Sequence, residues 1–589
     1  LFSLFAIVGQ ARIVTGTVTD AELNEPAIGT SVTVKGQQRG QVTDIDGKYS
    51  IDVPNDKAVL VFSMVGYKTV TVPVGDKTVI DVTLESDTEL LGEVVVTAMG
   101  QSQSKSKLNF SVQELKSDDV VAGQSSNFVN TLQGKVAGVQ VSMAGGSPNS
   151  ASQIVIRAIS SINSAQSNEP LFVVDGMPIR GGASSMADIN PNDIESMSVL
   201  KGAAASALYG QEGSNGVILI TTKSGKDGKV TVTVNGGWEL SHTAHMPKLQ
   251  TEFIGGSNGF YITNSTGGWG PRMNPEMGDK YYDNVGEFLG TGFMQKYDVS
   301  VSGGNELFSA YASANFMDNQ GVVPHDYKKR LGFFVKGEFN PSSTVKIMLS
   351  TNYIDNTARG FGNSMSTVYG WAINRNMADY RLPNGLPNWS CRYDDWEILN
   401  DGQRLGAGLS PYYSRYMDGS KTEGQRVIVN SLVSWEPIKN LTFTGKFAYD
   451  KGWSTYQSWS VPRYAQDEFV FDDLGISADG TGSKNDWYGR MGGFNFDTSR
   501  SQRITAQFLA NYLWNINQDW NLNFFLGGEY TESKGLEGSF GGQHFLLEGD
   551  FYSFNNLDPD IFTLKDNTFY RSSRNKYGYF GEIRLDWHS

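Results

Sequence analysis

Residues that could perform catalysis are few in this sequence, and they do not form a known catalytic motif. The 589 residues include five His and one Cys, and no His-Glu-x-x-His zinc motif or Gly-rich phosphate loop occurs. Only His242 and His245 lie close together, in an expected loop, where solvation is a better explanation than metal binding. The remaining candidates are scattered: His325, His544, His588 and Cys391. We therefore predict no enzymatic activity, no cofactor and no metal site.

Tryptophans are better candidates for binding. Five of them lie in segments that we expect to be long loops: Trp371, Trp389, Trp396, Trp453 and Trp459. An exposed indole stacks well on a sugar ring or on a peptide side chain. For any single indole, packing within its loop or a place at a membrane interface is the more common role. The sequence leaves both roles open, and we take these five as candidate substrate-binding residues.

A further candidate interaction is backbone pairing. The run Glu93, Val94, Val95, Val96 and Thr97 resembles a strand and lies between two polar stretches, residues 85–89 and 101–107. A tethered strand of this kind can add to the sheet edge of a partner through its backbone donors and acceptors. The alternative is an ordinary buried strand.

Composition restricts the class of protein that presents these residues. Hydrophobic residues make up 39% of the chain, and no internal run approaches the roughly 20 apolar residues of a spanning helix. The net charge of −14 argues against a nucleic-acid surface. The 67 Gly and 12% aromatic residues are typical of many strands joined by polar loops. Residues 1–11 read as the end of an export signal, because an apolar run is followed by small residues at Gly9 and Ala11.

The two segments that follow are predicted to be compact domains. Residues 12–88 contain β-branched runs separated by turn residues, a pattern that predicts a small Ig-like or prealbumin-like sandwich. Residues 89–107 form the strand and its linker, and residues 108–225 have a mixed α/β pattern. In that domain we expect a helix presenting Phe128, Leu132 and Val136 on one face, and another helix beginning near Ile194.

The alternation of apolar and polar residues over 226–589 predicts part of a transmembrane β-barrel. Apolar and polar side chains alternate, as where Val230, Val232 and Val234 alternate with Thr231 and Thr233. We expect about ten strands, at 229–240, 293–304, 306–317, 330–339, 343–354, 425–435, 441–450, 502–514, 520–531 and 575–587. Short turns alternate with long loops at 241–292, 355–424, 451–501 and 532–574, an asymmetry that a soluble sandwich does not explain.

The size of the α/β domain bears on the size of the barrel. Side chains already fill a barrel of eight strands, whereas plugged barrels have about 22 strands. Ten strands are therefore too few to surround residues 108–225. We expect the chain to be a truncated form of a longer protein, with about half of the barrel absent.

Several long motifs, in a fixed order, resemble the SusC/RagA family of TonB-dependent outer-membrane transporters. They lie at residues 91–98, 132–139, 171–179, 194–210 and 216–223. The resemblance implies that residues 91–98 are the TonB box, that 108–225 are the plug and that 12–88 are a carboxypeptidase-regulatory-like domain. One departure is Ala158 after Arg157, where the family usually has Gly.

The resemblance implies the function and the partners that we expect. The protein would import an oligomeric nutrient, a glycan or a peptide, through the outer membrane, energised by TonB with ExbB and ExbD. Glu93 to Thr97 would bind TonB, and a SusD-like surface lipoprotein would be a further partner. The N-terminal domain would be periplasmic, the strands would contact membrane lipid and the long loops would be extracellular. The alternative functions are a passive outer-membrane receptor or adhesin and a soluble secreted binding protein.

Overall fold

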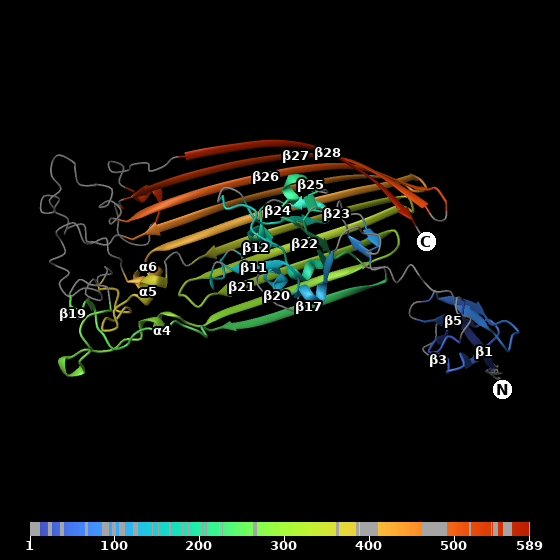
Figure 1. The fold of residues 1–589 in the computed structure, drawn as a ribbon, viewed down its shortest axis with the longest axis horizontal. Coiled ribbons are helices and arrows are strands. Elements are labelled where there is room, and N and C mark those ends of the chain that lie inside the picture. The colour runs from blue at the N-terminus through green and yellow to red at the C-terminus, as the bar shows by residue number, and fades with distance from the viewer. Residues whose placement is uncertain are drawn as a thin grey trace, which may run out of the picture. The chain divides into compact units, whose positions relative to one another are not determined.

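The fold is described from a computed structural model (Figure 1). It describes residues 12–587 except for 22–25, 36–39, 65–66, 68, 85–93, 97–101, 105–111, 122–127, 144, 151, 164–166, 180, 187, 203–204, 207–208, 226–227, 263–267, 361–364, 384–387, 389–409, 462–491, 518–519, 544, 546–551 and 558–567. The chain divides into two compact units. One contains residues 1–97 and 102–110, and the other contains residues 98–101 and 111–589.

The first unit contains a β-sandwich. One sheet has the order β4 (Lys48–Val53), β1 (Arg12–Asp20) and β7 (Val82–Leu84). The other has the order β3 (Gly40–Val42), β2 (Ser31–Val34), β5 (Val59–Ser63) and β6 (Val70–Pro73). Alternate residues of β4 are buried, so one face of each sheet packs into a shared apolar core. The predicted sandwich is confirmed.

Tyr49 of β4 contacts both its own sheet and the facing sheet. Its hydroxyl donates a hydrogen bond of 2.7 Å to the carbonyl oxygen of Ile80, and its ring meets that of Phe62 edge-on at 5.3 Å. Gly16 lies under this contact, where a Cβ would overlap the Ile80 carbonyl oxygen. Glycine is therefore required at residue 16 for packing.

A short hairpin follows the sandwich in the sequence. Strand β8 (Val94–Val96) pairs antiparallel with β9 (Ser102–Ser104). The predicted strand at Val94 to Val96 is therefore present, whereas Glu93 and Thr97 lie outside the described residues.

The second unit begins with a small α/β plug, residues 112–225. Its central sheet has the order β10 (Gln113–Lys116), β15 (Ile194–Leu200), β16 (Val217–Thr222), β13 (Leu171–Val174) and β14 (Met177–Ile179). A hairpin of β11 (Val139–Met143) and β12 (Ser152–Ile156) packs beside it. The helical elements are α1 (Ser117–Val121), η3 (Phe128–Leu132), α2 (Ala183–Met186), η4 (Pro191–Asp193) and η5 (Gly210–Gly213).

The helix predicted to begin near Ile194 is wrong. Asn190 caps only the single 3-10 turn η4, and β15 starts at Ile194. Strand β15 pairs with neighbours on both edges, so its nearly continuous apolar run is buried by a sheet. A short apolar run does not distinguish a buried strand from a helix. The helix predicted to present Phe128, Leu132 and Val136 is also shorter than expected. Only the 3-10 turn η3 forms, and it ends at Leu132.

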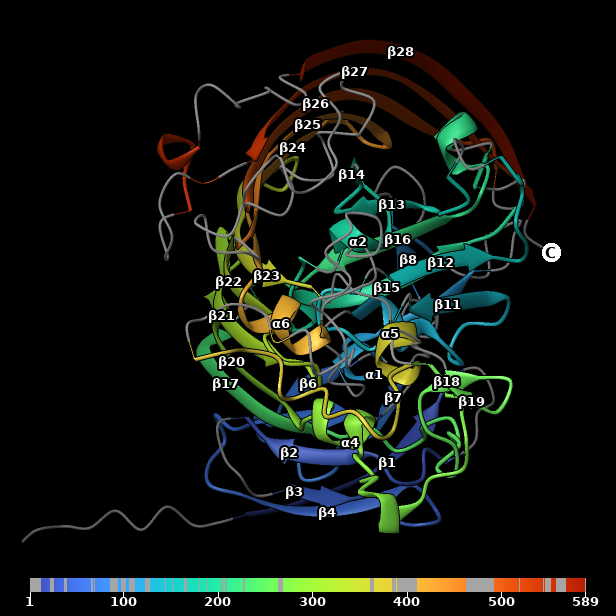
Figure 2. The ribbon, with the colours of Figure 1, turned by 90° about the vertical axis from the view of Figure 1, so that its left-hand side faces the viewer.

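Ten antiparallel strands form a wall beside this plug. They are β17 (Gly228–Ser241), β20 (Gly292–Gly304), β21 (Phe308–Gln320), β22 (Tyr327–Ser342), β23 (Val345–Arg359), β24 (Gly419–Ile438), β25 (Leu441–Ser460), β26 (Gly493–Asn515), β27 (Trp520–Gln543) and β28 (Thr568–Trp587). Each pairs with the next along the chain. Figure 2 shows them as an arc, with plug strands on its concave side. The predicted mainly β fold and the strand number are confirmed.

Most strands extend beyond their predicted ends on the side of the long loops. Strand β25 continues to Ser460 and β27 to Gln543, each about ten residues past the prediction. In these extensions the outward residues are no longer regularly apolar, so the alternation fades although the ladder continues. Trp453 and Trp459 therefore lie in β25 and not in a loop.

The outward face of the wall is apolar and aromatic. Exposed side chains there include Val230, Val232, Leu526, Phe508 and Tyr579. Near the short turns the outward aromatic side chains include Phe308, Phe339 and four tryptophans: Trp435, Trp514, Trp520 and Trp587. An apolar band edged by aromatic residues is the surface that a bilayer requires.

Small elements occupy the long loops. They are β18 (Gly256–Ser257), β19 (Phe260–Tyr261), η6 (Pro275–Met277), α4 (Asn284–Phe288), α5 (Met365–Tyr369), α6 (Pro411–Tyr416) and η10 (Phe554–Asn556). Among the described residues, no helix combines the length and the apolar character that crossing a bilayer demands.

We expect Gly16→Val to destabilise the N-terminal sandwich by about 3 kcal/mol, because the added side chain overlaps the Ile80 carbonyl group and forces β1 away from the segment that pairs with it before β7. Protease susceptibility of the sandwich in urea measures the effect. Ser50→Ala, an exposed change on β4, is the control and should behave like wild type. Equal susceptibility of the two variants would contradict the packing role of Gly16.

Candidate functional site

The candidate site is the boundary between the plug and the wall. Side chains of the wall strands that face inward contact the plug through both apolar and polar groups. Ile354 of β23 and Ile428 of β24 join the apolar core of the plug. Among the described residues, Ser147 of the plug donates to Asp326, just before β22, at 2.7 Å, and four further polar links join the plug to the wall strands themselves.

The first link joins Asp175 to Lys336. Asp175 and Gly176 both have positive φ, at 49° and 79°, which makes the tight turn between β13 and β14. The Asp175 carboxylate accepts from the Thr222 amide at 3.0 Å and hydroxyl at 2.7 Å. Lys336 of β22 lies 3.3 Å from the same carboxylate, and its side chain is only 6% exposed. Lys446 of β25 is a second cation whose charge acts on Asp175.

The second link surrounds Asp193 at the start of β15. The hydroxyl of Tyr311 on β21 donates to the Asp193 carboxylate at 2.9 Å. Beside it, Asn190 donates to Asp298 of β20 at 2.6 Å. Burial raises the pKa of Asp193 to about 6, although hydrogen bonds from neighbouring groups oppose the shift.

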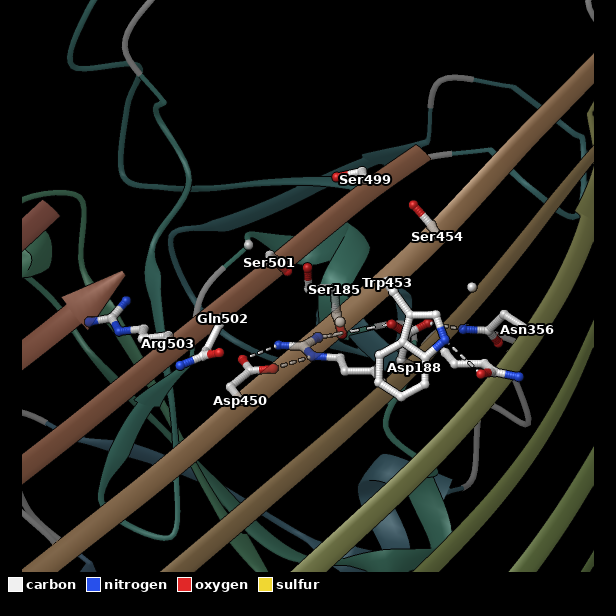
Figure 3. Close-up of a pocket in the computed structure, with 15 residues that line it drawn as sticks. Ser185, Asp188, Asn356, Asp450, Trp453, Ser454, Ser499, Ser501, Gln502 and Arg503 are labelled. Atoms are coloured by element: carbon white, nitrogen blue, oxygen red, sulfur yellow. Dashed lines mark hydrogen bonds and ion pairs between the residues drawn. The ribbon is translucent and has the colours of Figure 1, made fainter. Parts of the chain in front are cut away.

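The third link centres on Arg426 of β24. Its guanidinium donates two hydrogen bonds to Asp450 of β25, at 2.9 and 2.7 Å (Figure 3). Its remaining nitrogen reaches the plug, donating to the carbonyl oxygen of Ser185 at 3.2 Å. The plug residue Asp188 lies 3.9 Å from the same nitrogen and accepts from Asn356 at 2.8 Å. Arg426 therefore bridges two wall strands and α2 of the plug.

The fourth link joins Glu212 of η5 to two cations. Arg503 of β26 lies 3.4 Å from it and Lys576 of β28 lies 3.3 Å from it. Burial alone would raise the pKa of Glu212, but these two cations together lower it. The links therefore reach the plug from strands β20 to β28.

A polar cavity of about 350 Å³ adjoins the third link. Plug residues Gly181, Ser185 and Asp188 line one side of it, and strands β23 to β26 line the other (Figure 3). Its inward-facing side chains on the wall are polar or charged: Asn356, Arg426, Asp450, Ser454, Ser499, Ser501 and Arg503. Such a lining suits water or a ligand rich in hydroxyl and amide groups.

A second cavity, of about 690 Å³, lies at the long-loop end. Tyr412 and Tyr416 of α6 line it together with Phe288 of α4 and His325. The two tyrosines stack on each other and on Tyr380. The cavity therefore presents aromatic faces, unlike the polar cavity beside the plug.

The candidate tryptophans are not brought together. Trp371 is 7% exposed and packs in the loop core that contains Val285 and Phe288. Trp453 pairs in register with Gln425, to which its ring nitrogen donates at 2.7 Å. Trp453 is among the residues that line the polar cavity (Figure 3). Its position alternates with the inward-facing Asp450 and Gly452, so its side chain starts from the outward face of β25.

The remaining candidate residues divide into two groups. Trp459 stacks on Tyr552 at 5.2 Å, in an aromatic cluster with Phe494 and Phe545. Trp389, Trp396, Cys391, His544 and His588 lie outside the described residues. His242 and His245 are exposed, and the described residues contain no group of three side chains suited to a metal ion.

Sequence reasoning missed the residues that link plug and wall. Asp175 is visible as a turn residue and Lys336 as a member of a polar face, but neither is distinctive there. One feature of the sequence could have identified them. In a strand whose outward residues are apolar, a charged residue on the alternate, inward face is a candidate for contact with the plug. Arg426, Asp450 and Arg503 all meet this description.

We expect Lys336→Met to loosen the plug by about 2 kcal/mol, because it leaves the buried Asp175 carboxylate without its nearest cation. This loss of stability is smaller than for an isolated ion pair, because the charge of Lys446 still acts on Asp175. Hydrogen exchange of the β16 amides measures the loosening. Asp175→Asn with Lys336→Met removes both charges and should recover most of the protection; equal exchange in wild type and Lys336→Met would contradict the link.

We expect Asp193→Asn to remove a pH dependence from the plug. The pKa of Asp193 is higher in the folded plug than in the unfolded chain, so its stabilising effect is complete below about pH 4 and is lost as the pH rises through about 6. Urea unfolding of the plug between pH 4 and 8 measures this slope. Asp119→Asn, at an exposed plug carboxylate, should leave the slope unchanged; a slope that survives in Asp193→Asn rules out this residue as its source.

Comparison with known proteins agrees with this architecture. Residues 104–217 match the TonB-dependent receptor plug domain, and residues 14–96 match the CarboxypepD_reg-like domain. The TonB-dependent receptor SusC of Bacteroides thetaiotaomicron is 36% identical over 601 residues, which is 98% of this chain and 55% of SusC. The TonB-dependent receptor P3 of Formosa agariphila is 34% identical over all of this chain and 55% of its own length. The chain thus spans about half the length of the curated relatives it matches.

A solved structure has the same fold. The RagAB peptide importer in its closed-closed state superimposes with a TM-score of 0.64 at 20% identity, covering 82% of this chain and 54% of that one. The curated relatives are receptors and not enzymes, which agrees with the prediction that this chain is not an enzyme. With its regulatory-like domain, its plug and its antiparallel wall in this order, the chain belongs to the SusC/RagA family of TonB-dependent receptors.

Proposed function

We propose that the protein imports an oligomeric nutrient across the outer membrane, with energy delivered through TonB. The observation that carries the proposal is the set of four polar links that hold the plug inside the wall. A solute cannot pass a seated plug of this kind unless the plug moves or rearranges. Breaking one buried pair costs about 3–5 kcal/mol, so the movement requires work from outside the barrel.

The proposed point of attachment for that work is strand β8, Val94 to Val96, with Glu93 and Thr97 beside it. It pairs with β9 in a sheet of two strands, so one edge of β8 is not used within that sheet. A partner strand can add to such an edge through backbone hydrogen bonds. The partner that we propose is TonB, working with ExbB and ExbD in the inner membrane.

The proposal extends to the rest of the assembly. The N-terminal sandwich and β8 would face the periplasm, and the long loops would face the exterior, where a SusD-like lipoprotein would cover the barrel. The substrate is a glycan or a peptide. SusC and the RagAB peptide importer are relatives by sequence and by fold, respectively. We propose that the substrate binds in turn in the aromatic cavity at the long-loop end and in the polar cavity beside Arg426.

We expect Val95→Pro to abolish import, because proline removes the backbone donor at the centre of β8 and disfavours strand pairing. A deletion strain carrying the full-length variant is grown on a panel of oligosaccharides and peptides as sole carbon source. Val95→Thr keeps the donor and the β-branched shape, so it should grow as wild type does. Normal growth of the proline variant, with both proteins present in the outer membrane, would favour the passive receptor instead.

A further inference from the structure

Four basic residues lie together on one side of the wall, and the links to the plug do not use them. They are Lys451 of β25, Arg500 of β26, Lys534 of β27 and Arg571 of β28, and all four are exposed. We call them the basic patch. Strands β25 to β28 are consecutive neighbours in the sheet (Figure 1).

The register of the strands places the four residues next to one another. Lys451 and Lys534 both pair with Gln502, one from each side. Arg500 and Arg571 both pair with Leu536, again from each side. The two rows are adjacent on the same face, so each basic residue has the next one as a diagonal neighbour, at about 7–8 Å between backbones.

The basic patch is on the outward face of the wall. Successive residues of a strand point to opposite faces, so residues an even number apart share a face. Lys451 shares a face with Phe447, Arg500 with Phe508, Lys534 with Leu526 and Arg571 with Tyr579. All four of these apolar partners are exposed on the outside of the wall. The inward face of the same strands instead carries Asp450, which binds Arg426, and Arg503, which pairs with Glu212 of the plug.

The level of the basic patch follows from the aromatic residues below it. Tyr530 and Tyr577 form an outward pair with ring centroids 5.1 Å apart. Trp520, at the short-turn end of β27, lies ten residues before Tyr530, which is about 24 Å along the membrane normal for a strand tilted by about 45°. That distance matches the height of the apolar band of outer-membrane barrels, about 25 Å. Lys534 lies four residues further on, at the level of the lipid headgroups.

Little negative charge on this face compensates the basic patch. Glu532 pairs with Lys534 at 2.8 Å. Lys451 lies over the ring of Trp453, 6.0 Å from its centroid. Within the part of the chain that the structure describes, Arg500 and Arg571 have no carboxylate in ion-pair range. By contrast, the outward Lys329 of β22 lies 3.0 Å from Asp318 of β21.

We infer that the basic patch binds the phosphate of an anionic lipid headgroup at the outer surface of the membrane. Guanidinium groups donate paired hydrogen bonds to phosphate oxygens, and lysines add charge at the same level. The indole of Trp453 beside Arg500 and Lys451 is suited to the interface between chains and headgroups. This inference rests on the membrane location in the proposed function, but not on transport.

The test measures lipid binding by the full-length protein in a neutral detergent. Monophosphoryl lipid A and its dephosphorylated form are the two probes, and inorganic phosphate is the third. The test variant is K451Q/R500Q/K534Q/R571Q. The matched control is K48Q/K57Q/K77Q/K116Q, which removes the same charge from exposed lysines outside the wall. Heat-modifiable migration on gels verifies that each variant has a folded barrel.

We expect wild type and control to prefer the phosphorylated lipid by about tenfold or more, and the patch variant to lose that preference. Equal preference in the patch variant and wild type overturns the inference, as does saturation by inorganic phosphate alone. If the patch variant no longer binds the SusD-like lipoprotein but binds lipid as wild type does, the basic patch is a protein-binding site instead. Absence of wild type from the outer-membrane fraction would overturn the proposed function itself, whereas failure of lipid binding in a membrane-inserted protein overturns only this inference.

Discussion

The plug–wall boundary depends on one constraint: a charge buried there must have a partner across the boundary. Lys336 and Asp175 are 6% and 4% exposed, so neither can rely on water. Each is therefore fixed in place by the other and by Thr222. Buried pairs contribute little net stability but are costly to break. The boundary is thus specific in its seating, and breaking all of its links at once is costly.

The same constraint explains why the links are distributed around the plug. Asp175, Asp188, Asp193 and Glu212 are all plug carboxylates, and each one meets a different group of wall strands. Displacing the plug as a rigid body would break all four links together. Removing or unfolding one segment, such as α2 beside Arg426, would break only the links of that segment. The distribution therefore favours stepwise release over displacement of the whole plug.

The sequence predicted the wall better than the boundary. A strand that faces lipid outside and polar groups inside has a period of two residues, and that period is visible at Val230, Val232 and Val234 without any structure. The extension of β25 to Ser460 was not visible, because outside the apolar band the ladder no longer requires alternation. Ile194 to Leu200 was assigned wrongly, since burial on both faces erases the period that separates a strand from a helix. The four links could not be predicted, because each joins residues more than 100 positions apart in the sequence.

Register connects the two functions that we assign to the wall. In β25, Asp450 points inward to Arg426, while the adjacent Lys451 points outward to the level of the headgroups. A shift of one residue would exchange every such pair, placing the plug-linking carboxylate in the lipid interface and a lysine against Arg426. Both placements are unfavourable, so the inward links and the outward basic patch specify the same register from opposite faces. A single register therefore places the inward side chains against the plug and the outward basic patch at the lipid headgroups.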